Sequence, residues 1–246
     1  EHYYHFDGIS PINGLNREII SNVEGELKKR GHNLPVYFGN RNWHPFATAT
    51  AEKMAEEGIR RVAVFATSAW GGYSACRQYD EDIAAMRQHL ADNGLPEIEF
   101  TKIRQFYDHP KFIAEMADAV AEAWRRIPAE KTGSARMLFT AHSVPNAHDN
   151  VGGADGDKNL YSRQVAEASR LVAERVGISD YDLVWQSRSG NPKTPWLEPD
   201  IVDHTTALHE KDGVGAVVVC PIGFISDHME VIWDLSLIHI SEPTRQ

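Results

Sequence analysis

A histidine and a row of carboxylates are the side chains of this sequence best suited to metal or proton chemistry. His142 follows the apolar run 137–141, and a neutral imidazole, whose ordinary pKa is about 6.5, can accept a proton or coordinate a metal at neutral pH. Asp227, Glu230 and Asp234 are spaced at i, i+3 and i+7, which places three carboxylates on one face of a helix. The helix dipole fully explains an acid at position 227, but it explains the two later acids less well because it fades after the first turn. The chain has 12 histidines, so position rather than residue type singles out His142.

A second group of interest is a polar loop that contains two tryptophans. Trp185 ends an apolar run, and Trp196 follows after a segment rich in polar residues, glycine and proline. A flat apolar ligand would suit such a loop. Alternatively, the tryptophans fill a gap in the hydrophobic packing, and the sequence pattern does not separate these two interpretations.

The elements that must position these residues alternate between helix and strand. Apolar residues at helical spacing predict helices, and short β-branched or aromatic runs predict buried strands. The predicted helices cover residues 12–27, 47–57, 74–93, 110–126, 160–176 and 199–210, and the predicted strands cover 35–39, 61–66, 98–103, 137–141, 183–186 and 216–220. This alternation indicates an α/β protein with parallel sheets, and a chain of 246 residues favours two three-layer lobes.

We place the lobe boundaries at residues 1–104 and 105–235. Residues 236–246 break the pattern of the preceding segment and are interpreted as a non-native tail. In parallel sheets, ligands bind beyond the carboxyl ends of the strands, so the loops after residues 66, 141, 186 and 220 are the candidate site loops.

Composition excludes several classes of function. The 25 Lys and Arg residues against 35 Asp and Glu residues give a net charge of -10 without a basic stripe, which argues against nucleic acid as a partner. Cys76 and Cys220 lack the spacing of a disulfide scaffold, so we expect a protein of the reducing cytoplasm. The longest apolar run, residues 213–225, is shorter than the ~20 residues of a membrane helix. We expect no transmembrane segment and a monomer.

Common catalytic motifs are missing from the sequence. It contains no G-x-S-x-G nucleophile elbow, no H-E-x-x-H metal motif, no P-loop and no G-x-G-x-x-G dinucleotide motif. Hydrolase and nucleotide-binding functions are therefore disfavoured.

Three segments around the candidate residues together resemble the ferrochelatase family. They are TAHSVP at 140–145, WQS at 185–187 followed by PWL at 195–197, and PIGFISDHME at 221–230, in the family's order. Residues 8–11 (GISP), 37–45 (YFGNRNWHP) and 106–112 (FYDHPKF) extend the resemblance over residues 1–235. The sequences of these segments most resemble those of actinobacterial members, which implies insertion of Fe²⁺ into coproporphyrin III to give coprohaem.

The resemblance implies two Rossmann-like lobes of the chelatase type, with a porphyrin in the cleft between them. It implies that His142 and Glu230 are the catalytic pair that meets the iron and the pyrrole protons, and that Asp234 continues a row of metal ligands. It also implies substrate-binding roles for five further residues: Ser10, Tyr107, Trp196, Arg41 and Asn42. Of these, Arg41 and Asn42 match positions that vary among relatives.

The sequence departs from the family pattern in three respects. The family's first strand and its following loop would lie before residue 1. The carboxylate row should continue one turn past Asp234, where this chain has Ile238. Many actinobacterial relatives hold a [2Fe-2S] cluster on four cysteines, whereas this chain has only Cys76 and Cys220, so we expect no cluster and no cofactor beyond the substrate iron.

Other functions remain open at this stage. A protoporphyrin IX ferrochelatase would differ only in its substrate. A cobalt chelatase for sirohydrochlorin also uses histidines at strand ends, but the tryptophan-rich loop and the SDHME segment favour iron insertion. A tetrapyrrole carrier would bind porphyrin without metallating it, and a histidine paired with a carboxylate argues against that passive role.

Overall fold

The computed structural model describes residues 11–153, 157–191, 193–226, 231 and 235. The chain divides into two compact units. The first consists mainly of the described part of Glu1–Thr67 together with Cys76–Arg104, and the second mainly of Ser68–Ala75 and Gln105–Ile225. One boundary between the units falls between residues 104 and 105, and the segment Ser68–Ala75, which follows the first strand, packs with the second unit.

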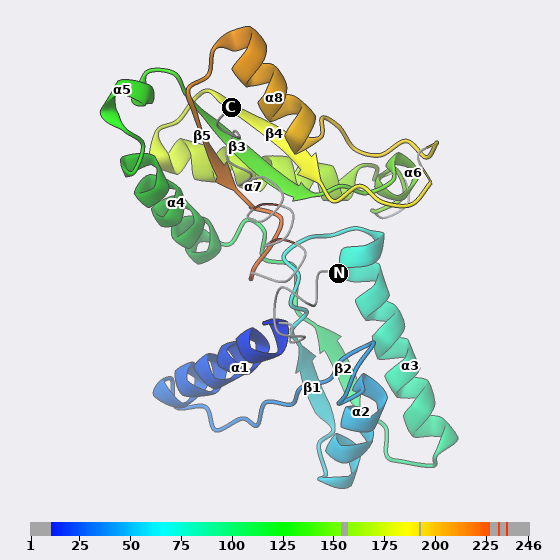
Figure 1. Ribbon diagram of the computed structural model, residues 1–246. Coiled ribbons are helices and arrows are strands. Elements are labelled where there is room, and N and C mark those ends of the chain that lie inside the picture. The colour runs from blue at the N-terminus through cyan, green and yellow to red at the C-terminus, as the bar shows by residue number, and fades with distance from the viewer. Residues whose placement is uncertain (1–10, 154–156, 192, 227–230, 232–234, 236–246) are drawn as a thin grey trace. The chain divides into compact units, whose positions relative to one another are not determined.

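The second unit is built on a three-stranded parallel sheet with the order β4-β3-β5. Its strands are β3 (Ala135–His142), β4 (Tyr181–Gln186) and β5 (Ala216–Cys220). Helices α4 (Pro110–Arg125) and α7 (Leu160–Val176) cover one face of this sheet, and α8 (Ile201–Asp212) covers the other (Figure 1). The unit is therefore a three-layer α/β structure, and β3 is its central strand.

Side-chain alternation along β3 explains why both faces of the sheet are covered. Met137 and Phe139 point into the core formed with α4 and α7, whereas Leu138 points toward α8, and all three are fully buried. A strand buried on both faces reads as a continuous apolar run, which is the pattern that the sequence displays here. Two short helices, α5 (Ala129–Thr132) and α6 (Asn146–Asp149), lie in the connections.

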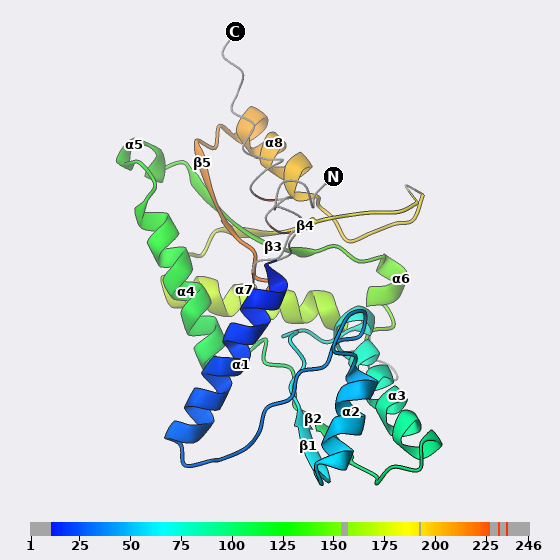
Figure 2. The ribbon, with the colours of Figure 1, turned by 60° about the horizontal axis from the view of Figure 1, so that its bottom comes forward.

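The first unit contains a two-stranded parallel sheet of β1 (Arg61–Val64) and β2 (Glu99–Lys102). Helices α2 (Ala47–Glu56) and α3 (Gln78–Asp92) pack side by side against this sheet (Figure 2), and their apolar residues form a common core with Phe100 and Ile98. A π-helical turn (Tyr73–Arg77) precedes α3, and α1 (Ile12–Lys29) has no fully buried residue within the described structure. The apolar stripe of α1 is half-buried at best.

The structure confirms the expected α/β class and most of the expected elements, but it corrects one strand. Residues 35–39 form no strand; only an isolated bridge joins Asn40 to Phe46. A short apolar run becomes a strand only where a neighbour can accept its hydrogen bonds, and no described strand lies beside this one. The expected strand 137–141 is longer than predicted and includes His142 as its last residue.

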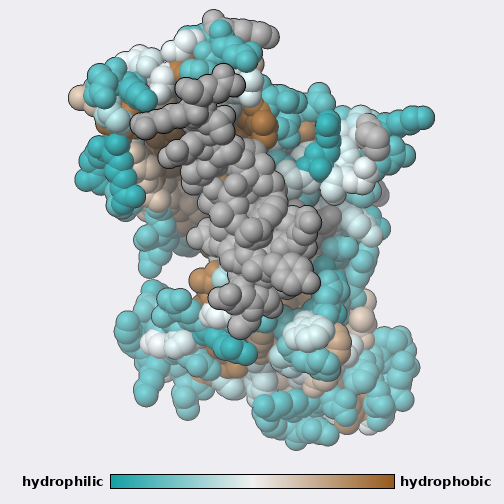
Figure 3. Space-filling view, viewed as in Figure 1, coloured by the Kyte–Doolittle hydropathy of each residue, from teal (hydrophilic) through white to brown (hydrophobic). Residues whose placement is uncertain are grey.

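The surface matches the polar composition of the chain. On the face shown in Figure 3, the described residues are mostly hydrophilic, and the hydrophobic ones are scattered over it. Within the described part of the chain, no helix combines the length and apolar character needed to cross a membrane.

An ion-pair network lies on the α8 face of the second sheet. Arg136 on β3 donates two hydrogen bonds to Asp182 on β4, at 2.8 and 2.9 Å, and His204 of α8 lies 3.1 Å from the same carboxylate. The Arg136 guanidinium, and secondarily His204, lower the pKa of Asp182. The charged form of this carboxylate is thus stabilised in the folded state.

We predict that Asp182→Asn lowers the free energy of unfolding by about 1.5–3 kcal/mol at pH 7, because hydrogen bonds to a charged group are lost. A carboxyl group whose pKa is lowered by folding stabilises the fold above its unfolded pKa of about 3.9, and that contribution disappears as the pH falls through the folded pKa. The difference between the two proteins should therefore shrink toward pH 3, as measured by urea unfolding. Glu167→Gln, which breaks a half-exposed pair with Arg170, is the control and should cost at most about 0.5 kcal/mol. Equal losses in both variants would contradict the role of the network.

Candidate active site

His142 lies at the carboxyl end of the central strand of the second unit, directly opposite Gln186 of β4. Its Nδ1 atom is 2.5 Å from the backbone oxygen of Ser143. A carbonyl oxygen can only accept a hydrogen bond, so Nδ1 must carry the proton in the neutral ring. This leaves Nε2 as the nitrogen with a lone pair, which is the form needed to accept a proton or bind a metal.

The peptide group between His142 and Ser143 is fixed at both of its polar atoms. Its carbonyl oxygen accepts a hydrogen bond of 2.9 Å from the Tyr161 hydroxyl, and its N–H donates one of 2.8 Å to the Gln186 carbonyl. The Ser143 hydroxyl donates to the Leu197 carbonyl at 2.9 Å and is buried. Ser143 thus has a structural hydrogen bond, which agrees with the missing nucleophile motif around it.

The loops after β3 and β4 run alongside each other beyond the strand ends. Pro145 and Trp196 form an isolated antiparallel bridge, and the Leu197 N–H donates to the Val144 carbonyl at 3.0 Å. The indole Nε1 of Trp196 and the side-chain Oδ1 of Asn146 are both buried without a hydrogen-bond partner among the described residues. Trp196 therefore lies on the loop that is hydrogen-bonded to the His142 segment, and its indole N–H has no hydrogen-bond partner among the described residues.

The two tryptophans of this region have different roles. Trp185 is 4% exposed and belongs to the core on the α4–α7 face, where its ring lies 5.8 Å from that of Tyr161. It fills the packing of the second unit, which was one of the two interpretations left open by the sequence. Trp196 is only partly buried and is the one that a ligand could contact.

The loop after β5 passes directly over the end of β3. The Gly223 N–H donates to the Thr140 carbonyl at 3.1 Å, and its own carbonyl accepts from the indole of Trp70 at 2.8 Å. A Cβ atom on Gly223 would lie 2.4 Å from Ala141 Cβ and 2.6 Å from Ala141 Cα. The segment that leads to the expected carboxylate row thus packs against Ala141, the residue that precedes His142. Glu230 and Asp234 themselves, like Ser10, lie outside the described residues.

Tyr107 joins the same neighbourhood through Trp70. The rings of Trp70 and Tyr107 are 6.4 Å apart, and Trp70 also contacts Phe112 edge-on. The loop after residue 66 is one of the candidate site loops predicted from the sequence, but that prediction assigned no role to Trp70. A tryptophan just beyond a strand end, followed by two glycines, was the signal that could have identified it.

Arg41 and Asn42 belong to the first unit, and the Arg41 side chain is hydrogen-bonded to α3. The Arg41 guanidinium binds both carboxylate oxygens of Asp82 and the side chain of Gln78 on α3, and it lies over the Tyr79 ring. The hydrogen-bonded Asp82 raises the pKa of Arg41. This arginine ties its loop to α3, whereas Asn42 is exposed.

Burial governs the other titratable groups near the strand ends. Desolvation raises the pKa of Tyr161, so its hydroxyl keeps its proton and acts as a donor. Burial also raises the pKa of Cys220 to about 12, which keeps this thiol protonated at neutral pH and makes it a poor metal ligand. The Cys220 side chain is part of the core at the end of β5.

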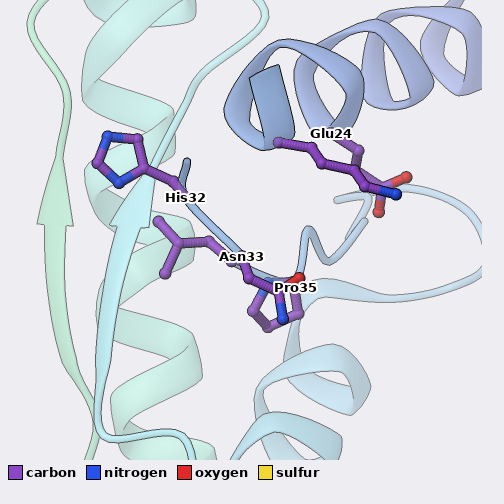
Figure 4. A pocket seen from close by; sticks show the side chains of 6 residues that line it. Glu24, His32, Asn33 and Pro35 are labelled. Carbon is purple, nitrogen blue, oxygen red and sulfur yellow. The ribbon is translucent and has the colours of Figure 1, made fainter. Parts of the chain in front are cut away.

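The described residues alone do not form a complete metal site. No group of three or more His, Cys, Asp or Glu side chains with suitable geometry occurs among them. A hollow of about 350 Å³ occurs in the first unit between the end of α1 and the segment that follows it, and it contains none of the expected site residues (Figure 4). Glu24 and His32 lie on opposite sides of this hollow, which is partly open to solvent.

The chain is similar to ferrochelatases both at the level of the family and at the level of individual curated proteins. The family model described as ferrochelatase matches residues 1–242. A coproporphyrin III ferrochelatase of Corynebacterium glutamicum is 63% identical over 234 residues, which cover 95% of this chain and 63% of that protein. Proteins of the same name from Corynebacterium diphtheriae and Nocardia farcinica are 57% and 58% identical and are covered to 65% and 66% of their lengths. The chain thus spans slightly under two thirds of the length of these curated relatives.

We predict that Gly223→Ala displaces the loop after β5, because the added methyl group would collide with the backbone of Ala141 rather than with a flexible side-chain tip. Overpacking of this kind costs about 1–3 kcal/mol, measurable by chemical unfolding, and should also quench or shift the fluorescence of Trp70. Gly133→Ala is the matched control, since Gly133 has ordinary helical backbone angles and nothing within 4 Å of an added Cβ. If both variants behaved alike, the close approach of the two loops would be refuted.

Proposed function

This chain belongs to the ferrochelatase family, and from that premise we propose that it carries the metal-inserting centre of a coproporphyrin III ferrochelatase, which converts coproporphyrin III and Fe²⁺ to coprohaem. The observation that carries the proposal is the environment of His142. Its imidazole lies at the carboxyl end of a buried central strand with Nδ1 bound to a backbone carbonyl, so Nε2 is the acceptor nitrogen. The relatives named above are all coproporphyrin III ferrochelatases.

Metal insertion sets requirements that these residue types can meet. Two pyrrole N–H protons must leave, Fe²⁺ must lose water, and the planar ring must bend so that its nitrogen lone pairs become accessible. A neutral imidazole supplies a base or a nitrogen ligand, and carboxylates supply oxygen ligands. In the proposed centre His142 and Glu230 act as the pair at the ring, and Asp234 continues the ligand row.

Positions around His142 support a site that takes a flat ring. Three loops converge at the end of β3: the loop that carries Trp196, the loop after β5, and the loop of Trp70 with Tyr107 packed beside it. Aromatic faces suit a macrocycle, and the Trp196 side chain, on the loop bridged to the His142 segment, is only partly buried. We assign Ser10, Tyr107 and Trp196 to porphyrin contact. Arg41, held by Asp82, would act by shaping its loop rather than by binding a carboxylate directly, with Asn42 beside it exposed.

The proposal requires no resident cofactor. Four thiolates are needed for a [2Fe-2S] cluster, whereas residues 1–246 supply two cysteines, of which Cys220 is buried with a raised pKa. We therefore propose that iron enters only as substrate. Cysteines without a disulfide fit a cytoplasmic enzyme, which we further propose acts as a monomer.

We predict that His142→Ala lowers the rate of iron insertion at least about 100-fold, because loss of a positioned base removes a factor of 10²–10⁴. Porphyrin absorbance followed under anaerobic conditions with Fe²⁺ measures this rate, and porphyrin fluorescence quenching measures binding separately. The assay should use this chain and also a chimera in which residues 1–235 replace the matching segment of the Corynebacterium glutamicum relative. His209→Ala, an exposed histidine at the end of α8, is the control and should retain normal turnover. Near-normal turnover by His142→Ala with intact porphyrin binding would refute the proposed role of the imidazole.

We also predict a preference for coproporphyrin III over protoporphyrin IX, with a ratio of kcat/KM of at least about 10. Protoporphyrin IX has two vinyl groups where coproporphyrin III has propionates, so hydrogen-bond donors that bind those propionates would be left unpaired. The same assay with each porphyrin at matched concentration measures the ratio. A ratio near one, or one that favours protoporphyrin IX, would assign this chain to the alternative substrate. Porphyrin binding without turnover by the chimera would favour a carrier.

A further inference from the structure

One constrained group in the second unit, outside the expected catalytic residues, is the hydroxyl of Tyr161. It donates to the His142 carbonyl at 2.9 Å, on the side of the peptide opposite to the N–H that donates to Gln186. This peptide group and the backbone angles of Ser143 together set where the next carbonyl, that of Ser143, points. The Ser143 carbonyl is the acceptor for His142 Nδ1 and thereby selects the imidazole tautomer. Tyr161 therefore binds the carbonyl of the residue directly before the one that selects the tautomer.

Tyr161 is itself closely packed against two neighbours, Trp185 and Gly72. Its side chain is 8% exposed, and its ring packs 5.8 Å from that of Trp185. Gly72 approaches so closely that an added Cβ would lie 3.2 Å from Tyr161 Cβ. A side chain with so little freedom can transmit the geometry of its own backbone to the residue that it binds.

The backbone of Tyr161 is fixed by a buried carboxylate. Asp149 is 2% exposed, and its two oxygens accept from the N–H and the hydroxyl of Ser162 at 3.1 and 2.6 Å. Asp149 thereby satisfies an N–H in the first turn of α7, the turn that carries Tyr161. The Asn159 N–H also donates to the Asp149 backbone carbonyl. The short helix after the His142 loop and the start of α7 are joined into one rigid support.

We propose that Tyr161 is a positioning residue for the metal-inserting reaction: its hydroxyl fixes the His142–Ser143 peptide so that Nδ1 of His142 is protonated and Nε2 faces the reacting centre. This inference rests on the function proposed above, since the tautomer matters only if Nε2 acts on a proton or a metal. Tyr161 touches the backbone of His142 rather than the substrate. Its loss should therefore reduce turnover without weakening porphyrin binding.

The first experiment separates kcat from KM. In the full-length chimera, Tyr161→Phe removes only the hydroxyl and should lower kcat about tenfold, with KM for the porphyrin changed less than twofold, because a small misplacement of a catalytic group costs rate rather than affinity. Tyr181→Phe is the matched control: Tyr181 packs edge-on against Phe139 at 5.3 Å in the same unit, and its hydroxyl has no hydrogen-bond partner among the described residues. Its kcat should remain at the wild-type value. Replacing Tyr161 with 4-aminophenylalanine restores a donor and should recover most of the lost rate.

The second experiment observes the imidazole directly, without metal or porphyrin. Long-range ¹H–¹⁵N spectra of ¹⁵N-histidine protein at about pH 8.5, well above the ordinary imidazole pKa, distinguish the two neutral tautomers. The His142 signal, identified by its absence in His142→Ala, should show protonated Nδ1 in the wild type and in Tyr181→Phe. In Tyr161→Phe it should show a mixture of tautomers, and 4-aminophenylalanine should restore the single form.

The results distinguish failure of this inference from failure of the proposed function. A wild-type chimera that metallates porphyrin while Tyr161→Phe keeps its kcat and its single tautomer would overturn the positioning role and leave the function intact. A rate loss in Tyr161→Phe that 4-aminophenylalanine does not rescue would also overturn it, because the loss would then come from packing. A tautomer change in a protein that never metallates porphyrin would support the structural link while refuting the function.

Discussion

The parallel pairing of β3 with a strand on each side is the constraint on which the rest of the second unit depends. Because β3 is the central strand, its backbone groups are satisfied by β4 and β5, and its side chains can be apolar on both faces. Parallel strands end at the same edge of the sheet, so the loops after all three converge there. His142 is the last residue of this central strand and is therefore the point at which the loops meet.

Backbone hydrogen bonds, rather than side-chain contacts, join these loops. The Leu197 N–H binds the Val144 carbonyl, the Gly223 N–H binds the Thr140 carbonyl, and the Ser143 N–H binds the Gln186 carbonyl. Such bonds fix chain paths while leaving most side chains free to face a ligand. The steric requirement for a residue without a Cβ at position 223 is the clearest place where this closeness constrains the sequence.

The second unit was predicted from sequence more completely than the first for a physical reason. Its strands are buried on both faces and its long helices carry continuous apolar stripes, so local pattern and tertiary packing agree. In the first unit, residues 35–39 resemble a strand but have no described strand beside them. The Arg41 guanidinium binds Asp82, forty-one residues later in the chain, a pairing that no local pattern reveals. The short helices α5 and α6 were missed because a four-residue turn has no periodicity.

The sequence alone determined the α/β class, the places of the long helices and buried strands, and the family, because these depend on periodicity and on motifs that are contiguous in the chain. It also identified His142 as the residue of interest through its place after an apolar run. Only the tertiary structure decided which nitrogen of that imidazole carries the proton, that Trp185 is a core residue whereas Trp196 lies on the loop beside His142, and that Trp70 and Tyr161 support the site. These properties arise from contacts between residues far apart in the chain, whose partners are selected by packing of the sheet and its helices and leave no local mark in the sequence.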